Sequence, residues 1–312
     1  MKDKILVCGS IAYDYLMNFD GLFKDSLKQT NLDALSISFL ANEREKHWGG
    51  CAANISYSLA LLGQKPILFS AAGGDFDEYD EWLTKNHVDT SFVARSKGEL
   101  TASAYILSDK EENQMMIFSP GASGNTKLAM SLDGLPIDEI AYAIIAPDNP
   151  GRVFAMVQEC IRLDIPYIFD PGQITHILDK ETLDHSIRHA KGLMANEFET
   201  KILEEKLEMS KKDFSEHVEF FVSTLGEKGS ELFTKDGKQD VSVVKPEHVI
   251  DPTGCGDAYR AGLLKGLMEE KHLNEAVQMG TLMGTLVVAE KGTQKHSFTK
   301  DDFERYYSHA FK

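Results

Sequence analysis

The stretch Asp251-Pro-Thr-Gly-Cys-Gly-Asp257-Ala-Tyr-Arg-Ala-Gly262 decides the fold. Gly254 and Gly256 flank one small residue, so the backbone is expected to turn with positive φ and to point its N–H groups into one concavity. From residue 258 onward, apolar residues recur at helical spacing, which places Asp257 in the first turn of a helix. The stretch therefore predicts a phosphate site at the positive end of a helix, beside a carboxylate that can accept a proton from a hydroxyl.

The same residues also have a simpler interpretation as a loop and a helix start, because the helix dipole favours Asp in a first turn. Three further motifs weigh against it, namely Gly49-Gly50-Cys51-Ala-Ala-Asn54, Asn196-Glu-Phe-Glu199 and Thr224-Leu-Gly-Glu-Lys-Gly229. In this order the four motifs resemble those of the PfkB family of ribokinase-like carbohydrate kinases, over essentially the whole chain. Cys255 is the one departure from the family's C-terminal signature, because Ala is usual there.

Composition limits the partners. The formal net charge of −16 argues against a surface for nucleic acid or anionic membranes, so we expect small-molecule partners. The four cysteines, Cys8, Cys51, Cys160 and Cys255, lack metal-ligand spacing and are expected to be reduced thiols. Neither a signal peptide nor an apolar run of membrane length is found in the sequence, so a cytoplasmic location is expected.

Strand and helix patterns alternate between residues 66 and 234, which predicts an α/β fold with a mainly parallel sheet and helices on both faces. The resemblance implies a ribokinase-like three-layer sandwich, with residues 1–312 forming one domain. Insertions at about 15–48 and 98–120 contain short alternating pieces, including Leu35–Phe39, and are expected to form a small antiparallel lid sheet. Closure of that lid would exclude water, a competing phosphoryl acceptor. A helix is also predicted over 274–289.

The resemblance implies an acceptor site near the first strand, Ile5 to Cys8, and the first glycine pair. Asp14 follows that strand and matches a family aspartate that binds sugar hydroxyls; without the family it would be a solvated loop residue. For Gln173, which follows Asp170-Pro-Gly, a turn is the alternative role. The implied substrate-binding residues are Ser10, Asp14, Ser38, Gly49, Gly50, Asn54, Phe118 and Gln173.

On the nucleotide side, Asn196 and Glu199 have the spacing of a helix capping box. The resemblance implies that Glu199 also acts on Mg²⁺ through water, and the two roles are compatible. The implied ATP-binding residues are Asn196, Thr224, Gly226, Gly229, Thr253 and Gly292. Whether Asp251 and Thr253 also hold a monovalent cation such as K⁺ is left open.

The reaction implied is transfer of the γ-phosphoryl group of ATP to a primary hydroxyl. Asp257 would be the base, and the N–H groups of Gly254, Cys255 and Gly256 would form the anion hole. An ordinary Asp has a pKa of roughly 4, so it cannot form an alkoxide beforehand and must act late. Arg260, one turn further on, is expected either to pair with Asp257 or to point outward. The sequence contains no Walker loop.

The acceptor is inferred from the lid. The chain looks closest to the bacterial adenosine kinases of the family, and a purine needs flat partners such as Phe39, Trp48 or Phe118. A sugar phosphate would require a cluster of cations, whereas the lid offers Arg44, Lys46 and Lys110 among acids. The alternative is a ribokinase or another PfkB sugar kinase. A binding-only pseudokinase is disfavoured by the intact Asp257, and a dinucleotide oxidoreductase by the absence of Gly-x-Gly-x-x-Gly. Homodimerisation is left open.

Overall fold

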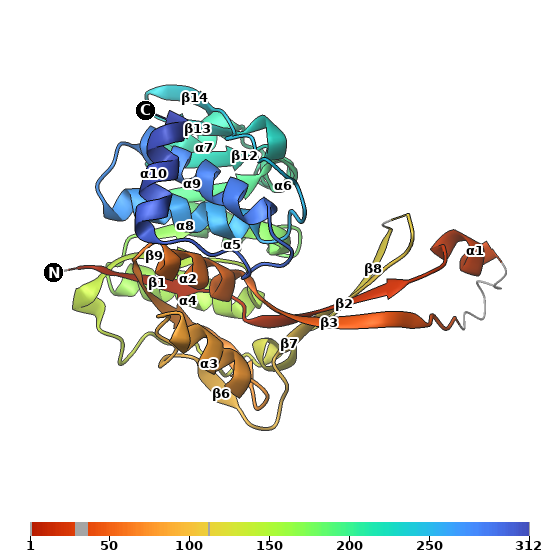
Figure 1. Cartoon of the computed structure of the whole chain (residues 1–312). Coiled ribbons are helices and arrows are strands. Elements are labelled where there is room, and N and C mark those ends of the chain that lie inside the picture. Colours follow the sequence, from red (N-terminus) through yellow and green to blue (C-terminus); the bar gives the residue numbers. More distant parts are fainter. Residues whose placement is uncertain (1, 29–36, 112, 312) are drawn as a thin grey trace.

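The computed structural model describes residues 2–28, 37–111 and 113–311. Within these ranges the chain forms a large sheet covered by helices, a small sheet that projects from it, and one short strand pair (Figure 1). None of the described helices is long and apolar enough to cross a membrane.

The large sheet runs in the order β14-β13-β12-β11-β10-β9-β1-β4. From β4 to β12 neighbouring strands are parallel, whereas β13 and β14 are antiparallel additions at one edge. This confirms the mainly parallel sheet that the sequence predicted. The strands are β1 (Lys4–Cys8), β4 (Lys65–Phe69), β9 (Ile140–Ile145), β10 (Tyr167–Phe169), β11 (Gly192–Asn196), β12 (Phe220–Thr224), β13 (Ser230–Thr234) and β14 (Gly237–Val241).

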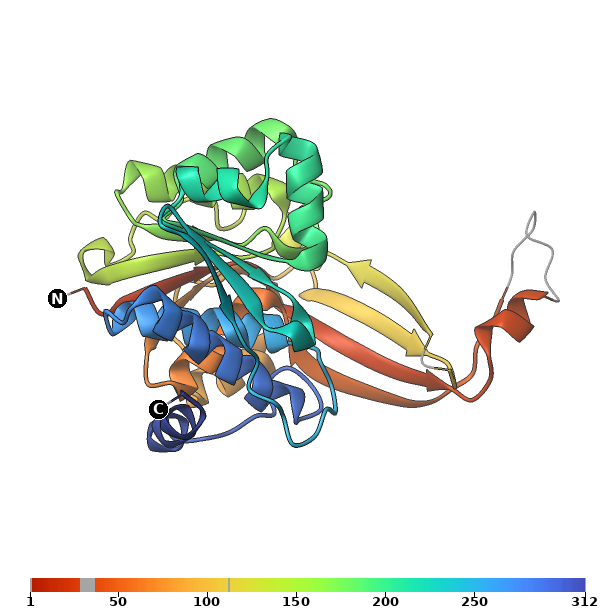
Figure 2. The ribbon, with the colours of Figure 1, turned by 90° about the horizontal axis from the view of Figure 1, so that it is seen from above.

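Both faces of the large sheet are buried, because alternate residues of its strands enter two separate apolar clusters. Ile5 and Val7 belong to one cluster, and Leu6 and Cys8 to the other. The first is covered by α2 (Cys51–Leu61), α3 (Asp77–Lys85), α8 (Cys255–Met268), α9 (Leu273–Val288) and α10 (Lys300–Phe311). The second is covered by α4 (Pro150–Arg162), α5 (Lys180–Arg188), α6 (Glu197–Leu207) and α7 (Lys211–His217). Figure 2 shows the two helical layers with the sheet between them. Burial on both sides explains why β1 is an unbroken apolar run.

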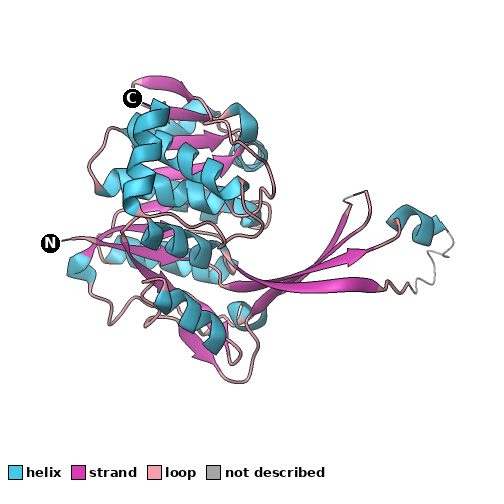
Figure 3. Cartoon of the chain, in the orientation of Figure 1, coloured by secondary structure: helices cyan, strands magenta, loops and turns pink. Residues whose placement is uncertain are grey.

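The small sheet has the order β3-β2-β7-β8 and projects away from the helical layers (Figures 1 and 3). Its strands are β2 (Ala12–Phe19), β3 (Ala41–Gly49), β7 (Ala102–Ser108) and β8 (Gln114–Ser119). The predicted antiparallel pairing is confirmed for β2 with β3 and for β7 with β8, whereas β2 and β7 are parallel. The short helix α1 (Phe23–Lys28) follows β2, and the pair β5 (Ala71–Gly73) and β6 (Ala94–Ser96) lies apart from both sheets.

Two local predictions need correction. Leu35 and Ser36 of the predicted strand Leu35–Phe39 lie outside the described residues, and residues 37–40 form no strand. The strand that pairs with β2 is β3, and this pairing runs from Ala41 to Gly49. Asp14 is within β2 rather than in a loop after β1, so it belongs to the small sheet. The helix predicted over 274–289 is confirmed by α9.

Candidate active site

Helix α8 begins at the glycine-rich turn that the sequence singled out. Gly254 is its N-terminal cap and has the left-handed φ of 81°, and Asp257 is in the first turn. Gly256 already belongs to the helix and has no positive φ. One left-handed residue therefore suffices to turn the chain, and the first N–H groups of α8 have no partner within the helix.

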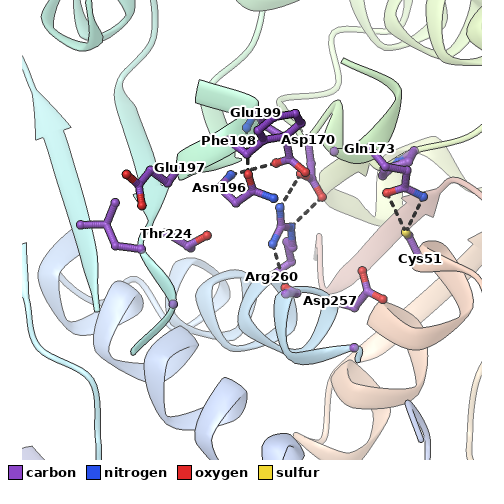
Figure 4. Close-up of a pocket in the computed structure, with 16 residues that line it drawn as sticks. Cys51, Asp170, Gln173, Asn196, Glu197, Phe198, Glu199, Thr224, Asp257 and Arg260 are labelled. Atoms are coloured by element: carbon purple, nitrogen blue, oxygen red, sulfur yellow. Dashed lines mark hydrogen bonds and ion pairs between the residues drawn. The ribbon is translucent and has the colours of Figure 1, made fainter. Parts of the chain in front are cut away.

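A pocket of about 610 Å³ opens beside this helix start, at the carboxyl ends of β10, β11 and β12 (Figure 4). Ligands bind at this end of the strands in open α/β sheets. The lining residues are Cys51, Pro147, Asp170, Gly172, Gln173, Asn196, Glu197, Phe198, Glu199, Thr224, Leu225, Gly226, Gly254, Gly256, Asp257 and Arg260. Arg260 is the one basic side chain in this lining, which is otherwise acidic or neutral.

Arg260 neither pairs with Asp257 nor points outward, so both predicted placements are wrong. Its Nε and Nη2 donate to the two carboxylate oxygens of Asp170 at 2.6 and 2.7 Å, and Nη1 donates to the carbonyl oxygen of Gly256 at 3.0 Å (Figure 4). The arginine is 6% exposed and Asp170 is 2% exposed. A Cβ at Gly256 would lie 2.9 Å from Nη1, so the guanidinium occupies the space a side chain would take.

Asp257 is half-buried and lies against helix α2. Its Oδ2 accepts a hydrogen bond from Nδ2 of Asn54 at 2.8 Å. Burial raises the pKa of Asp257 to about 6, and the Asn54 bond and the Arg260 charge oppose that rise. A carboxyl with a pKa of about 6 is a better proton acceptor near neutral pH than one with the pKa of roughly 4 assumed from sequence.

Asp14 approaches the same region from the small sheet. It is paired in register with His47 and Ala104, and its carboxylate rests on Gly49, where a Cβ would lie 2.3 Å from Oδ2. Burial, together with the charges of Asp257 and Asp251, raises the pKa of Asp14 to about 7. Asp14 and Asp257 are therefore two carboxyls with raised pKa values, close enough for the charge of Asp257 to act on Asp14.

The start of α2 is shaped by its glycines and by Ser10. Gly50 has a φ of 91°, and a Cβ there would lie 2.6 Å from the backbone of β2. The Oγ of Ser10 accepts a hydrogen bond from the N–H of Cys51 at 3.1 Å. Asn54 is 4% exposed, and its Oδ1 accepts a bond from Nε2 of Gln294 at 2.9 Å.

The predicted capping box at the start of α6 is confirmed. Oδ1 of Asn196 accepts from the N–H of Glu199, and Oε2 of Glu199 accepts from the N–H of Asn196, both at 2.8 Å. Burial and the charge of Asp170 raise the pKa of Glu199. Among the described residues no group of three or more His, Cys, Asp or Glu could hold a metal ion. A nucleotide-bound Mg²⁺ keeps waters and phosphate oxygens as ligands, so one nearby carboxylate fits that ion.

The remaining residues predicted for ATP are divided between the pocket and its surroundings. Thr224 and Gly226 line the pocket, whereas Gly229, whose φ is 91°, serves the tight turn into β13. Thr253 and Gly292 lie outside the lining, and their N–H groups donate to Oδ1 and Oδ2 of Asp251 at 2.9 Å. Although burial opposes the shift, these bonds lower the pKa of Asp251.

The aromatic residues proposed to stack on a purine differ in availability. Phe39 makes edge contacts with Phe19 and Phe23, and Trp48 stacks on Tyr79 at 4.6 Å between ring centroids. Phe118 is 55% exposed on β8. Ser38 is exposed and is absent from the pocket lining.

Several pocket residues were not predicted as site residues. Asp170 was recognised only as the end of a strand, and Cys51 and Phe198 were given no role. Gln294, outside the pocket lining, belongs to a loop that the resemblance placed near the adenine of the nucleotide. The Asp-Pro-Gly sequence after a buried strand was a usable signal for Asp170, because a carboxylate at a strand end in this fold faces the ligand edge. No local pattern identifies the partners of Gln294, because they come from two distant helices, Asn54 from α2 and both Tyr79 and Trp82 from α3.

A family model described as pfkB family carbohydrate kinase matches residues 2–300. The chain belongs to this family. This pfkB kinase is 31% identical to the nucleoside kinase of Methanocaldococcus jannaschii over 96% of its own length and 95% of that relative. The solved structure of the M. jannaschii nucleoside kinase has a TM-score of 0.89 and covers 98% of both chains. The Burkholderia thailandensis nucleoside kinase, solved in complex with inosine, is 32% identical, has a TM-score of 0.87 and also covers 98% of both chains. The ribokinase-like fold predicted from the motifs is therefore confirmed.

Proposed function

We propose that this pfkB kinase transfers the γ-phosphoryl group of ATP to the 5′-hydroxyl of a purine nucleoside, adenosine in the first instance. The observation that carries the proposal is the position of Asp257, a half-buried carboxylate with its pKa raised to about 6, at the N-terminus of α8 and in the wall of the pocket. The full-length similarity of the chain to two nucleoside kinases, one of them solved with inosine, supports a nucleoside acceptor.

In the proposed reaction Asp257 accepts the proton of the acceptor hydroxyl as the oxygen attacks the γ-phosphorus. The P–O bond to ADP breaks, and ADP leaves with that electron pair. The N–H groups of Gly254 and Gly256 stabilise the negative charge that develops, and the positive end of α8 adds to this effect. The N–H of Cys255, also predicted for the anion hole, donates to the carbonyl oxygen of Pro252 at 3.2 Å. General-base help contributes about 10²–10⁴-fold, so positioning and charge stabilisation must supply the rest.

The pairing of the small sheet supports a nucleoside-sized acceptor site. Asp14 pairs with Ala104 on β7, and Ala104 pairs with Phe118 on β8, so these side chains share one face. Two strand spacings separate Asp14 from Phe118, about 10 Å, which matches the reach of a purine nucleoside from ribose to base. We assign the ribose hydroxyls to Asp14, Gly49, Gly50 and Asn54, with Ser10 holding their backbone in place. Gln173 lines the neighbouring pocket beside Asp257, where its Oε1 lies 3.8 Å from Sγ of Cys51.

Two basic residues of the small sheet, Arg44 and Lys46, are engaged with aromatic rings or an acidic residue, which disfavours a sugar phosphate. Lys46 lies over the ring of Tyr13 at 4.0 Å and pairs with Glu78 at 3.1 Å. Arg44 lies over the ring of Tyr15 at 5.7 Å. Lys110 is in the exposed turn between β7 and β8. A phosphorylated acceptor would need such cations free to bind it.

ATP is assigned to the pocket beside Asn196, Thr224 and Gly226, with the turn at Gly229 and the loop at Thr253 and Gly292 around it. Mg²⁺, when bound, would neutralise charge on the phosphates, and Glu199 would hold it through water. A monovalent cation would be held near Asp251 and Thr253. The small sheet would act as the lid that excludes water.

A coupled ADP-release assay with adenosine, inosine, guanosine, cytidine, ribose and fructose 6-phosphate tests the proposal. We expect kcat/KM for adenosine to exceed that for ribose by at least two orders of magnitude. A preference for ribose would establish the sugar kinase alternative. No ADP release with any acceptor would leave only a binding function and would end the kinase proposal.

A further inference from the structure

A line of hydrogen bonds runs from Trp82 on α3 to Asp257. Nε1 of Trp82 donates to Oε1 of Gln294 at 3.0 Å, and Nε2 of Gln294 donates to Oδ1 of Asn54 at 2.9 Å. Nδ2 of Asn54 then donates to Oδ2 of Asp257 at 2.8 Å. Each link joins a different segment of the chain, and the first and last members are separated by two side-chain amides.

The direction of this line is fixed at its distant end. An indole N–H can only donate, so the oxygen of the Gln294 amide must face Trp82 and its NH₂ group must face Asn54. Asn54 then has to present its oxygen to Gln294 and its own NH₂ group to Asp257. The opposite orientation of Asn54 would place an amide oxygen against a carboxylate.

Tyr79 favours the same orientation of the Gln294 amide. Its hydroxyl proton is donated to the carbonyl oxygen of Gly49 at 2.9 Å, so its oxygen is free to accept a second bond from Nε2 of Gln294. Gln294 is 3% exposed and Asn54 is 4% exposed, so water has little access to replace a misdirected amide bond. Trp82 is half-buried and stacks with Trp48 and Tyr57.

We propose that Trp82 and Gln294 are positioning residues for phosphoryl transfer, which orient the Asn54 amide so that it always donates to Asp257. This inference rests on the proposed role of Asp257 as the base. The donated bond fixes Oδ2 and leaves Oδ1 to accept the proton of the acceptor hydroxyl. The indole thereby acts on the reaction through two intervening side chains.

The charge balance around Asp257 makes the proposal measurable. Cys51 and Asn54 face Asp257 from α2, Arg260 from its own helix and Asp170 from the end of β10. Its charge also reaches Asp14 on β2 and Tyr79 on α3. Within this set the Asn54 bond lowers the pKa of Asp257 against the effect of burial. An Asn54 amide that turns freely would lose part of that effect.

The test is the pH profile of kcat for Trp82→Phe, which keeps an aromatic ring but removes the N–H. We expect the acid limb of kcat to move to higher pH by about half a unit, with kcat at neutral pH lowered about 3- to 10-fold and KM for ATP unchanged. The matched control is Tyr57→Phe, because Tyr57 stacks on Trp82 and its hydroxyl donates to the carbonyl oxygen of His296, away from the line to Asp257. Its acid limb should stay in place.

A double-mutant cycle separates positioning from packing. If Trp82 acts through Gln294, then Trp82→Phe combined with Gln294→Met should have the pH profile of Gln294→Met alone. Additive shifts, or an unmoved acid limb in Trp82→Phe, would overturn the inference while leaving the proposed function intact. Full activity of Asp257→Asn would instead overturn the proposed function itself.

Discussion

Arg260 binds both carboxylate oxygens of Asp170, a residue 90 positions away in the sequence, at 2.6 and 2.7 Å. The pair joins the first turns of α8 to the end of β10, so the helix that contains Asp257 is fixed to the edge of the large sheet. Burial opposes the charge of Arg260, but the Asp170 carboxylate raises the pKa of that guanidinium. Arg260 therefore stays charged, and the pair lies in the wall of the pocket.

Arg260→Ala should lower the free energy of unfolding by about 3–5 kcal/mol, because it leaves the buried Asp170 charge without a partner. Urea unfolding measures this loss. Arg188→Ala is the control, since the Arg188–Asp184 pair is exposed on α5 and should contribute about 0–1 kcal/mol. Equal losses in the two variants would contradict the structural role of the buried pair.

Asp257→Asn should lower kcat by about 10²–10⁴-fold, because the amide cannot accept the acceptor's proton. Steady-state kinetics should show this loss, and calorimetry should show ATP binding close to that of the parent. Asp236→Asn, at an exposed turn, is the control for loss of a carboxylate. Turnover of Asp257→Asn equal to that of the parent would refute the assigned base.

The raised pKa of Asp257, about 6, predicts where activity is lost in acid. The base must be ionised to accept a proton, so kcat for the parent enzyme should fall as pH drops through about 6. A fixed-time assay over pH 5 to 8, with substrate saturating at each pH, measures the acid limb of the kcat profile. A limb near pH 4 would mean that the carboxylate is more solvated during turnover than the structure shows.

Asp14→Asn should stabilise the protein in the absence of substrate. The pKa of Asp14 is raised to about 7 by burial and by neighbouring carboxylates, so ionisation of Asp14 costs folding free energy. The contribution of protonated Asp14 to the free energy of unfolding is complete below its unfolded-state pKa of about 4 and is lost as pH rises through about 7. The stabilisation by Asp14→Asn should therefore be larger at pH 7.5 than at pH 5, by about 1–3 kcal/mol. Urea unfolding at both pH values checks this, and a constant difference would contradict it.

Phe118→Ala should raise KM for adenosine about 10-fold and leave KM for ATP unchanged, because a stacked ring contributes about 1–3 kcal/mol per base. Ile117→Ala is a matched control. Ile117 is 70% exposed on the same strand but points to the opposite face of the small sheet. Equal effects of the two substitutions would place the base elsewhere.

The large sheet and the start of α8 could be predicted from sequence because their signals are local. Buried parallel strands are continuous apolar runs, and the turn before α8 needs a glycine at Gly254, with its φ of 81°. The capping box of Asn196 and Glu199 was equally visible, since both residues are within one helical turn.

The partners of charged and amide side chains could not be predicted in this way. Arg260 was expected at Asp257 or in solvent because sequence spacing shows only neighbours on the same helix, whereas its partner Asp170 is on another strand end. The parallel pairing of β2 with β7 depends on how the small sheet joins the large one, and alternation in sequence is the same for both pairings. The hydrogen-bond partners of Gln294 could not be predicted either, because they are on α2 and α3, far away in the sequence.

The guanidinium of Arg260 fills the space beside Gly256, which limits the substitutions that position 256 accepts. Nη1 of Arg260 takes the volume where a methyl group at position 256 would stand, at 2.9 Å, and it also binds the carbonyl of that same residue. Positions 256 and 260 are therefore coupled for protein engineering, because a larger residue at the first requires the guanidinium at the second to move, and that movement disturbs its pairing with Asp170.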